Sequence, residues 1–250
     1  MSTDCKPFRV VYEFNFAGGA KKSFSMDFTH DTYEIIVRRN YKDIPEWAKL
    51  EYRKCPKCPV DPETVAYCPV AFNISGLMHS FGSMVSTEKC FVRCVTYQRS
   101  YSKMTDVMSG LASALSLITL SSPCPYLAPF RSLARFHMPF FTPEESLVRT
   151  ISFYLLSQYF TKKNCGSPDW KLEKLDKAFE YLKMLQDGMM SRTKGVFEGD
   201  ACVNAMHSFH VMIEFISFEI ESSLECLESF FYNGQQISVA RSSLDPFRQY

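Results

Sequence analysis

Four Cys-Pro dipeptides are the feature of this 250-residue chain with the clearest potential for chemistry. Ten cysteines and thirteen prolines would give only roughly 0.5 such dipeptides, the product of the two counts divided by the length. The cysteines concerned are Cys55, Cys58, Cys68 and Cys124. Four thiolates complete a tetrahedral zinc site or ligate a cubane iron–sulfur cluster. The sequence therefore predicts one metal centre held by these four side chains.

The first three cysteines form a Cys-x2-Cys-x9-Cys pattern, and the fourth lies in a loop between two expected helices. A Cys-x2-Cys pair brings two sulfurs together at a small cost in loop closure. A proline after each cysteine fixes the backbone and removes one N–H that could otherwise donate to the sulfur. Fewer such hydrogen bonds would leave more charge on sulfur and would lower the potential of a redox cluster.

The identity of the metal stays open between zinc and an iron–sulfur cluster. Zinc is the commoner structural metal for four cysteines, and it would cross-link the loop to the helices without doing chemistry. The Cys-Pro dipeptide recurs at iron–sulfur ligands, although the spacing matches neither standard ferredoxin pattern. Packed thiols without a metal are a third interpretation. The leading hypothesis is a metal-cross-linked binding or regulatory protein, and the alternative is an iron–sulfur redox or sensor protein.

Histidines provide weaker candidates. His137 is either a ligand or a neighbour of the ligands, or else a hydrogen-bonded residue of the core. His207, His210 and Glu214 share one face of an expected helix, which suits a metal or an acid–base pair as well as a semi-polar packing face. An enzyme that uses this face is a third hypothesis, and the sequence assigns no catalytic residue.

Charge and hydropathy exclude several classes of partner. With 28 basic and 27 acidic residues, neither nucleic acid nor an anionic membrane is expected as a partner. No stretch reaches ~18 consecutive apolar residues, and the first residues lack the apolar run of a signal peptide. We therefore expect a cytoplasmic protein with reduced thiols. The sequence indicates neither a protein partner nor a small-molecule ligand.

Alternating residue types predict strands near the start of the chain. Apolar and polar residues alternate over 8–16 and again over 24–28. The intervening Ala17-Gly-Gly-Ala20 suits a tight hairpin. Residues 7–38 are expected to form a small antiparallel sheet, and residues 90–97 are a candidate strand to join it.

Helices are expected after a segment, residues 40–70, in which prolines exclude long regular elements. Thr142-Pro-Glu-Glu145 is a helix start with a capping hydroxyl and acidic residues in the first turn. The buried stripe of this helix is predicted to contain Leu147, Ile151, Tyr154, Leu155 and Tyr159. The other expected helices cover residues 71–84, 105–120, 127–136, 167–186 and 200–231.

These elements predict an α+β fold, with a small N-terminal antiparallel sheet followed by a mainly α-helical bundle. We expect residues 1–104 to form a β-rich region with the Cys-Pro loop, and residues 105–250 to form a helical region. The two regions are expected to pack as one compact unit.

The cysteine motifs also resemble a known family. The relevant runs are Cys-Pro-Lys-Cys-Pro-Val-Asp-Pro-Glu-Thr-Val-Ala-Tyr-Cys-Pro, Ser-Ser-Pro-Cys-Pro-Tyr-Leu and Pro-Asp-Trp-Lys-Leu-Glu. They resemble an uncharacterised bacterial family, a domain of unknown function, over about residues 8–232. In that family the fourth motif continues Cys-Pro-His, whereas Tyr126 follows here. The resemblance implies a bacterial, cytoplasmic protein and brings no activity with it.

Overall fold

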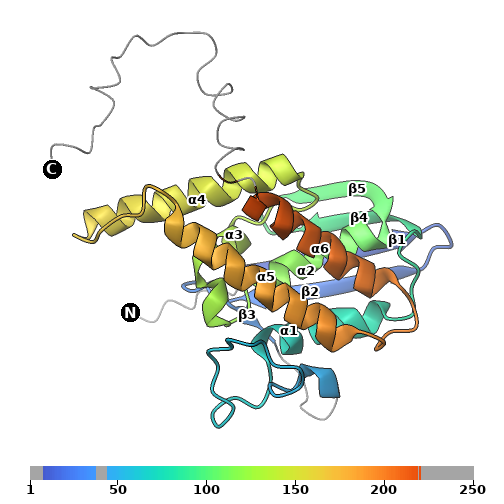
Figure 1. The fold of residues 1–250 in the computed structure, drawn as a ribbon. Coiled ribbons are helices and arrows are strands. Elements are labelled where there is room, and N and C mark those ends of the chain that lie inside the picture. Colours follow the sequence, from blue (N-terminus) through green and yellow to red (C-terminus); the bar gives the residue numbers. More distant parts are fainter. Residues whose placement is uncertain (1–7, 38–43, 219, 221–250) are drawn as a thin grey trace, which may run out of the picture. The chain divides into compact units, whose positions relative to one another are not determined.

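The computed structural model describes residues 8–37, 44–218 and 220. Contacts divide the chain into two units, Met1–Ser217 and Phe218–Tyr250. The first unit contains the sheet and the helices that bear on function. It is drawn in colour in Figure 1.

A five-stranded antiparallel sheet has the strand order β3-β2-β1-β4-β5. Its strands are β1 (Phe8–Phe16), β2 (Lys21–Phe28), β3 (Ile35–Ile36), β4 (Lys89–Val95) and β5 (Ser100–Asp106). The predicted hairpin joins β1 to β2, with Gly19 at a φ of 79°, and β4 pairs with β1 as expected. Buried and exposed residues alternate along β1 and β4, so one face of the sheet packs inward.

Helices follow and cover the inward face of the sheet (Figure 1). They are η2 (Glu46–Ala48), α1 (Pro69–Phe81), α2 (Val107–Leu120), η3 (Pro125–Phe130), α3 (Arg131–Arg135), α4 (Pro143–Lys163), α5 (Glu173–Thr193) and α6 (Ala201–Phe218). Helices α1 and α2 lie next to the sheet, and α5 and α6 lie beyond them (Figure 1). This arrangement confirms the predicted α+β class and the order of a sheet followed by helices.

Helix α2 approaches the sheet closely because it carries a glycine at the contact. A Cβ on Gly110 would lie 2.6 Å from the ring of Phe14 and 2.9 Å from Val92. The Phe14 ring in turn packs on Phe81 of α1, with 4.7 Å between ring centroids. Phe14, Val92 and Phe81 are all buried. The close contact at Gly110 therefore sets the distance between α2 and the sheet in the core.

Several helix starts follow from local capping. Asp106 accepts a hydrogen bond from the Ser109 amide and caps α2. Thr142 and Glu145 form the predicted capping box at α4. Helix α5 begins at Glu173, later than expected, because Leu172 takes a left-handed backbone conformation and Asp169 accepts from the first amides of the helix. The predicted helix over 127–136 is instead the 3-10 helix η3 followed by the short α3.

One expectation about burial was wrong, and one strand was missed. Leu155 and Tyr159 of α4 are 37% and 55% exposed, because the second half of the helix extends past the core (Figure 1). Strand β5 was not predicted, since its polar residues form a sheet edge whose pairing with β4 decides its conformation. This strand also spans residues 104 and 105, the expected boundary between the β-rich and helical regions. The part of the predicted last helix beyond residue 220 lies outside the described residues.

Among the described residues, no single helix is long and apolar enough to cross a membrane. Helix α2 together with the η3–α3 segment meets the length and composition test as a pair, with a bend of 113° between them.

Substitution Gly110→Ala is expected to destabilise the fold. The added methyl group overlaps two buried side chains, and such overpacking costs about 1–3 kcal/mol in the free energy of unfolding. Urea denaturation of the variant measures this loss. Gly18→Ala is the matched control, because a Cβ added there in the hairpin would have no atom within 4 Å. Equal stability of the two variants would contradict the close contact.

Candidate metal centre

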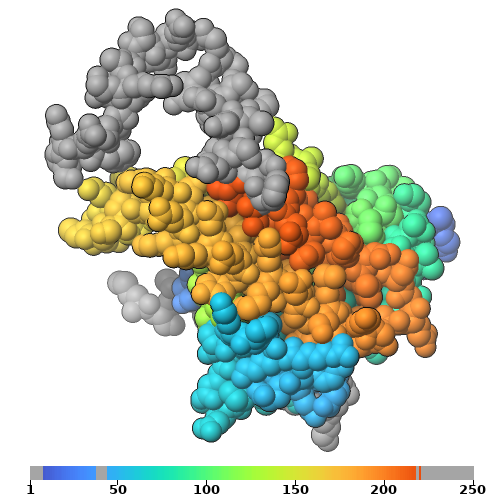
Figure 2. Space-filling model, in the orientation of Figure 1, coloured from blue at the N-terminus to red at the C-terminus, as the bar shows by residue number. Residues whose placement is uncertain are grey.

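The Cys-Pro loop, residues 49–67, projects from the first unit below α5, where it is coloured blue to cyan in Figure 2. An isolated bridge between Lys49 and Tyr67 closes its base. The Leu50 amide adds a hydrogen bond to the Ala66 carbonyl at 2.9 Å. Between these two ends the loop forms turns rather than a strand or helix, as its prolines predict.

Cys55 and Cys58 lie in one tight turn of this loop. The Cys58 amide donates to the Cys55 carbonyl at 3.0 Å. The Cys55 sulfur packs against α5 at Gly188, where a Cβ would lie 2.8 Å from Sγ. A glycine therefore makes room for this sulfur on the helix surface.

Cys68 and Cys124 each occupy the residue before a helix, with the following proline at the first helical position. The amides of Val70 and Ala71 interact with the Cys68 sulfur, and the amide of Tyr126 interacts with the Cys124 sulfur, although neither forms a full capping hydrogen bond. The sulfurs of Cys68 and Cys124 thus have amide neighbours, although the proline after each cysteine supplies no N–H. Each proline is the first residue of a helix, α1 or η3, and the backbone amides that follow it face the cysteine sulfur.

The four predicted cysteines come together from three separate segments. Every one of the six pairs among them interacts electrostatically. Burial, followed by the neighbouring thiols, raises the pKa of Cys55 to about 11 and that of Cys124 to about 12. Burial also raises the pKa of Cys68. A metal ion that binds these groups must displace their protons.

The side chains do not stand in the positions of bound ligands. Within the described residues, no group of three or more His, Cys, Asp or Glu side chains is close enough to hold a metal ion as it stands. The four thiols are thus neighbours, but their sulfur atoms do not surround a single position that a metal ion could occupy.

A buried arginine lies beside the thiols. Arg192 of α5 is 1% exposed and donates from Nη1 to the carbonyls of Trp47 and Lys49, and from Nη2 to that of Leu50, at 2.6 to 2.9 Å. Its Nε has no hydrogen-bond partner among the described residues. Its charge opposes the effect of burial on the thiols of Cys55 and Cys68. The guanidinium joins α5 to the start of the loop and places a positive charge next to the sulfurs.

Tyr126 fixes the loop from the other side. Its hydroxyl donates to the carbonyl of Lys57, between the two cysteines of the turn, and its ring stacks on Tyr181 of α5 at 4.4 Å. Tyr126 therefore contacts the backbone of the Cys-Pro loop. Sequence reasoning missed the contributions of Tyr126, Gly188 and Arg192, since each depends on a partner more than 50 residues away.

The other candidates lie elsewhere. His137 is half-buried, and its Nε2 lies 2.6 Å from the hydroxyl of Tyr12, which also bonds to Ser113. Burial lowers its pKa to about 3, so the imidazole is neutral. It is a hydrogen-bonded residue of the core.

The predicted helical face also exists. His210 lies 3.9 Å from both Asp187 and Glu214, while Glu214 pairs with Lys183 at 3.2 Å. His207 is exposed on the same helix, and its ring stacks near that of His210. The carboxylate of Glu214 is thus shared with a lysine of α5, which favours a polar packing face over an acid–base pair.

A comparison with family models identifies the family of the chain. The model described as a domain of unknown function (DUF6901) matches residues 10–232. The chain belongs to the DUF6901 family. The matched region of the DUF6901 domain includes all four Cys-Pro cysteines and every helix described above, but the match tests neither the cysteine pattern nor the bacterial origin. No curated protein and no solved structure matches the chain.

Substitution Arg192→Leu is expected to destabilise the DUF6901 domain strongly. Three backbone carbonyls lose their donor, and a buried acceptor left without a partner costs about 1–3 kcal/mol. Urea denaturation is the measurement. Lys194→Leu removes the same charge from an exposed position two residues later and serves as the control. A loss of stability that is equal in both variants would argue against the role of the guanidinium.

Proposed function

We propose that Cys55, Cys58, Cys68 and Cys124 hold one metal centre, and that this protein is a metal-cross-linked binding or regulatory protein without catalytic activity. The observation that carries the proposal is the gathering of all four Cys-Pro sulfurs from three segments of the chain. The other described cysteines away from this place are Cys90, Cys94 and Cys202, which are buried in the core, and the exposed Cys165.

The charge balance of the region supports a metal-bound thiolate set. A buried guanidinium requires negative charge nearby, and no carboxylate of the described residues forms an ion pair with Arg192. Zinc bound by four thiolates carries a net charge of about −2. Such a centre would complement Arg192, whereas four neutral thiols would not.

The position of the sulfurs supports a structural role. A cross-link among the turn of the loop, the start of α1 and the start of η3 would order a segment that has few regular hydrogen bonds. A zinc ion with four protein ligands has no open position for a substrate. The centre would therefore stabilise the loop for a binding function rather than carry out a reaction.

An iron–sulfur redox or sensor protein is the second candidate, and two observations favour it. Backbone amides interact with the sulfurs of Cys68 and Cys124, and hydrogen bonds to sulfur tune the potential of a cluster. Cys55 and Cys58 are only half-buried, which would give an electron partner or an oxidant access to one edge of a cluster.

A cytoplasmic location belongs to the same proposal. Thiols that bind a metal must stay reduced, and the cytoplasm maintains that state. The nearly balanced charge of 28 basic and 27 acidic residues gives no reason to expect a nucleic-acid partner.

The first test is the metal content of the full chain after anaerobic purification. We expect about one equivalent of zinc without colour, or iron with labile sulfide and a brown visible spectrum for the second candidate. Cys124→Ser and Cys58→Ala should lose the metal and lower the melting temperature by far more than Cys165→Ser does.

The controls separate the centre from ordinary packing. Cys90→Ser changes a buried thiol away from the centre and should keep the metal, as should the exposed Cys165→Ser. A protein without metal in either assay, or equal metal content in all four variants, would overturn the proposal.

Gly188→Ala gives a test that does not touch a ligand. In the metal-free protein the Cys55 side chain can rotate away from an added methyl group, and alanine in a helix is more stable than glycine by about 1 kcal/mol. In the metal-bound protein the sulfur is fixed, so the methyl group should weaken metal binding.

Competition with a chelator measures this affinity, and thermal melting of the metal-free form measures stability. Gly195→Ala is not a suitable control because its φ is 75°, whereas Gly18→Ala is open and unstrained. Unchanged metal affinity in Gly188→Ala would remove Cys55 from the ligand set.

A further inference from the structure

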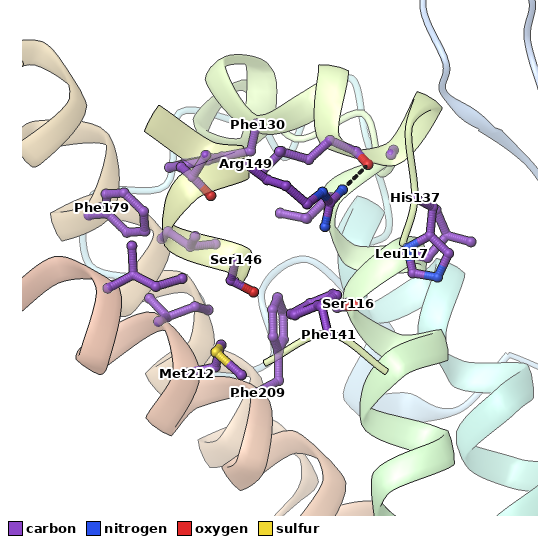
Figure 3. Close-up of a pocket in the computed structure, with 17 residues that line it drawn as sticks. Ser116, Leu117, Phe130, His137, Phe141, Ser146, Arg149, Phe179, Phe209 and Met212 are labelled. Carbon is purple, nitrogen blue, oxygen red and sulfur yellow. Dashed lines mark hydrogen bonds between the residues drawn. The ribbon is translucent and has the colours of Figure 1, made fainter. Parts of the chain in front are cut away.

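Helix α4 packs on the core with only one of its two sides. The inner side includes Ser146 and Tyr154, which are both buried. Figure 3 shows Ser146 and Arg149 beside a small cavity, where Arg149 donates to the Leu133 carbonyl at 3.3 Å. The charge of Arg149 also interacts with Glu145 on the same helix. Arg149 therefore has its partners within the chain, and the side of α4 that can meet another molecule is the opposite one.

This outer face of α4 is apolar over the second half of the helix. Leu155, Leu156, Tyr159 and Phe160 are 37%, 49%, 55% and 49% exposed. The exposed Ser152 continues the same face toward the start of the helix. Large apolar side chains that are exposed next to one another are typical of a surface that contacts another protein.

The two ends of the outer face carry opposite charges. The first turn of α4 is acidic and contains Glu144, whereas the last turn is basic and contains Lys163. Neither of these two side chains forms an ion pair with another described residue. Residues at heptad spacing lie in one line along the face, and they are Glu145, Ser152, Leu156, Tyr159 and Lys163. The remaining heptad position is Arg149, whose guanidinium bonds to α3 instead.

We propose that this protein forms a two-fold symmetric dimer in which the outer faces of two α4 helices pack antiparallel. The heptad line is symmetric about the level of Tyr154, so the two-fold axis passes there. Lys163 of one copy then lies opposite Glu145 of the second copy, and Leu156 lies opposite Ser152 of the second copy. Leu155 lies next to the axis, so the apolar patches of both copies meet at the centre.

The charge pattern of α4 is the reason to assign this face to a second copy. Helix α4 has 21 residues and is about 32 Å long, so pairing over its full length includes both charged ends. The acidic first turn of each copy meets the basic last turn of the other, and the two helix dipoles run in opposite directions. A face with charges of one sign would instead repel its own copy.

Sedimentation equilibrium of the full chain at micromolar concentrations tests the proposal. We expect a dimer whose population rises with protein concentration. Leu156→Glu places a charge at the centre of the contact and should give a monomer at every concentration measured. Val211→Glu is the matched control, because it changes an apolar residue of α6 that is 51% exposed, and it should keep the dimer. A reductant must be present, because a disulfide between exposed Cys165 side chains would also give a dimer.

Exchange of the end charges tests the register of the two helices. Lys163→Glu should weaken the dimer about tenfold, because an attraction at each end becomes a repulsion. Glu144→Lys should weaken it similarly, and it leaves the capping box of Thr142 and Glu145 intact. A mixture of the two variants should form a heterodimer that is tighter than either homodimer, because each changed charge then faces an opposite one. A purely structural role of Lys163 would give no preference for the mixed pair.

Four results would overturn the proposal. Three of them are a wild-type protein that is monomeric throughout, a dimer that persists in Leu156→Glu, and equal stability of the mixed and unmixed pairs. The fourth is a monomeric wild type whose melting temperature falls in Leu156→Glu, which would assign the patch to a contact within the chain. None of them bears on the metal centre, whose four cysteines all lie outside α4.

Discussion

The buried guanidinium of Arg192 is the interaction on which the region around the four cysteines depends. At the start of the Cys-Pro loop this one side chain donates hydrogen bonds to three carbonyl oxygens, which in a sheet would be bound by a neighbouring strand. It also brings positive charge to a place where thiols gather. Burying such a cation is unfavourable unless its hydrogen bonds and its charge are both compensated. The carbonyls meet the first requirement, and thiolates on a metal would meet the second.

Local patterns predicted most of the fold. The alternation in β1 and the capping box of α4 each depend on a few neighbouring residues, and the structure confirms both. The predictions fail where contacts between residues far apart in the sequence determine the conformation or the burial of a segment. Strand β5 is a polar sheet edge, and only its pairing with β4 distinguishes it from a loop. In α4 the periodic apolar stripe continues past Tyr154. The neighbouring elements do not extend that far, so the later residues of the stripe are exposed.

The candidate centre was predictable in its cysteines and not in its surroundings. Cys-Pro dipeptides are recognisable in the sequence because composition makes four of them improbable. Gly188 and Tyr126 carry no comparable signal, since a glycine in a helix and a half-buried tyrosine are both common. Their roles depend on which loop packs against α5.

The long separation between Arg192 and its partners also bears on the order in which the chain folds. Leu50 and Arg192 are 142 residues apart, so the Cys-Pro loop leaves the ribosome well before the helix that holds it. During synthesis the sheet and α1 can form from earlier contacts, while Cys55 and Cys58 remain accessible to solvent. Contacts of this span are slow to form, because their loop-closure entropy must be overcome first. The nascent chain thus passes through a period in which its thiols are more open to ions and oxidants than in the folded protein, where Cys55 and Cys58 are half-buried.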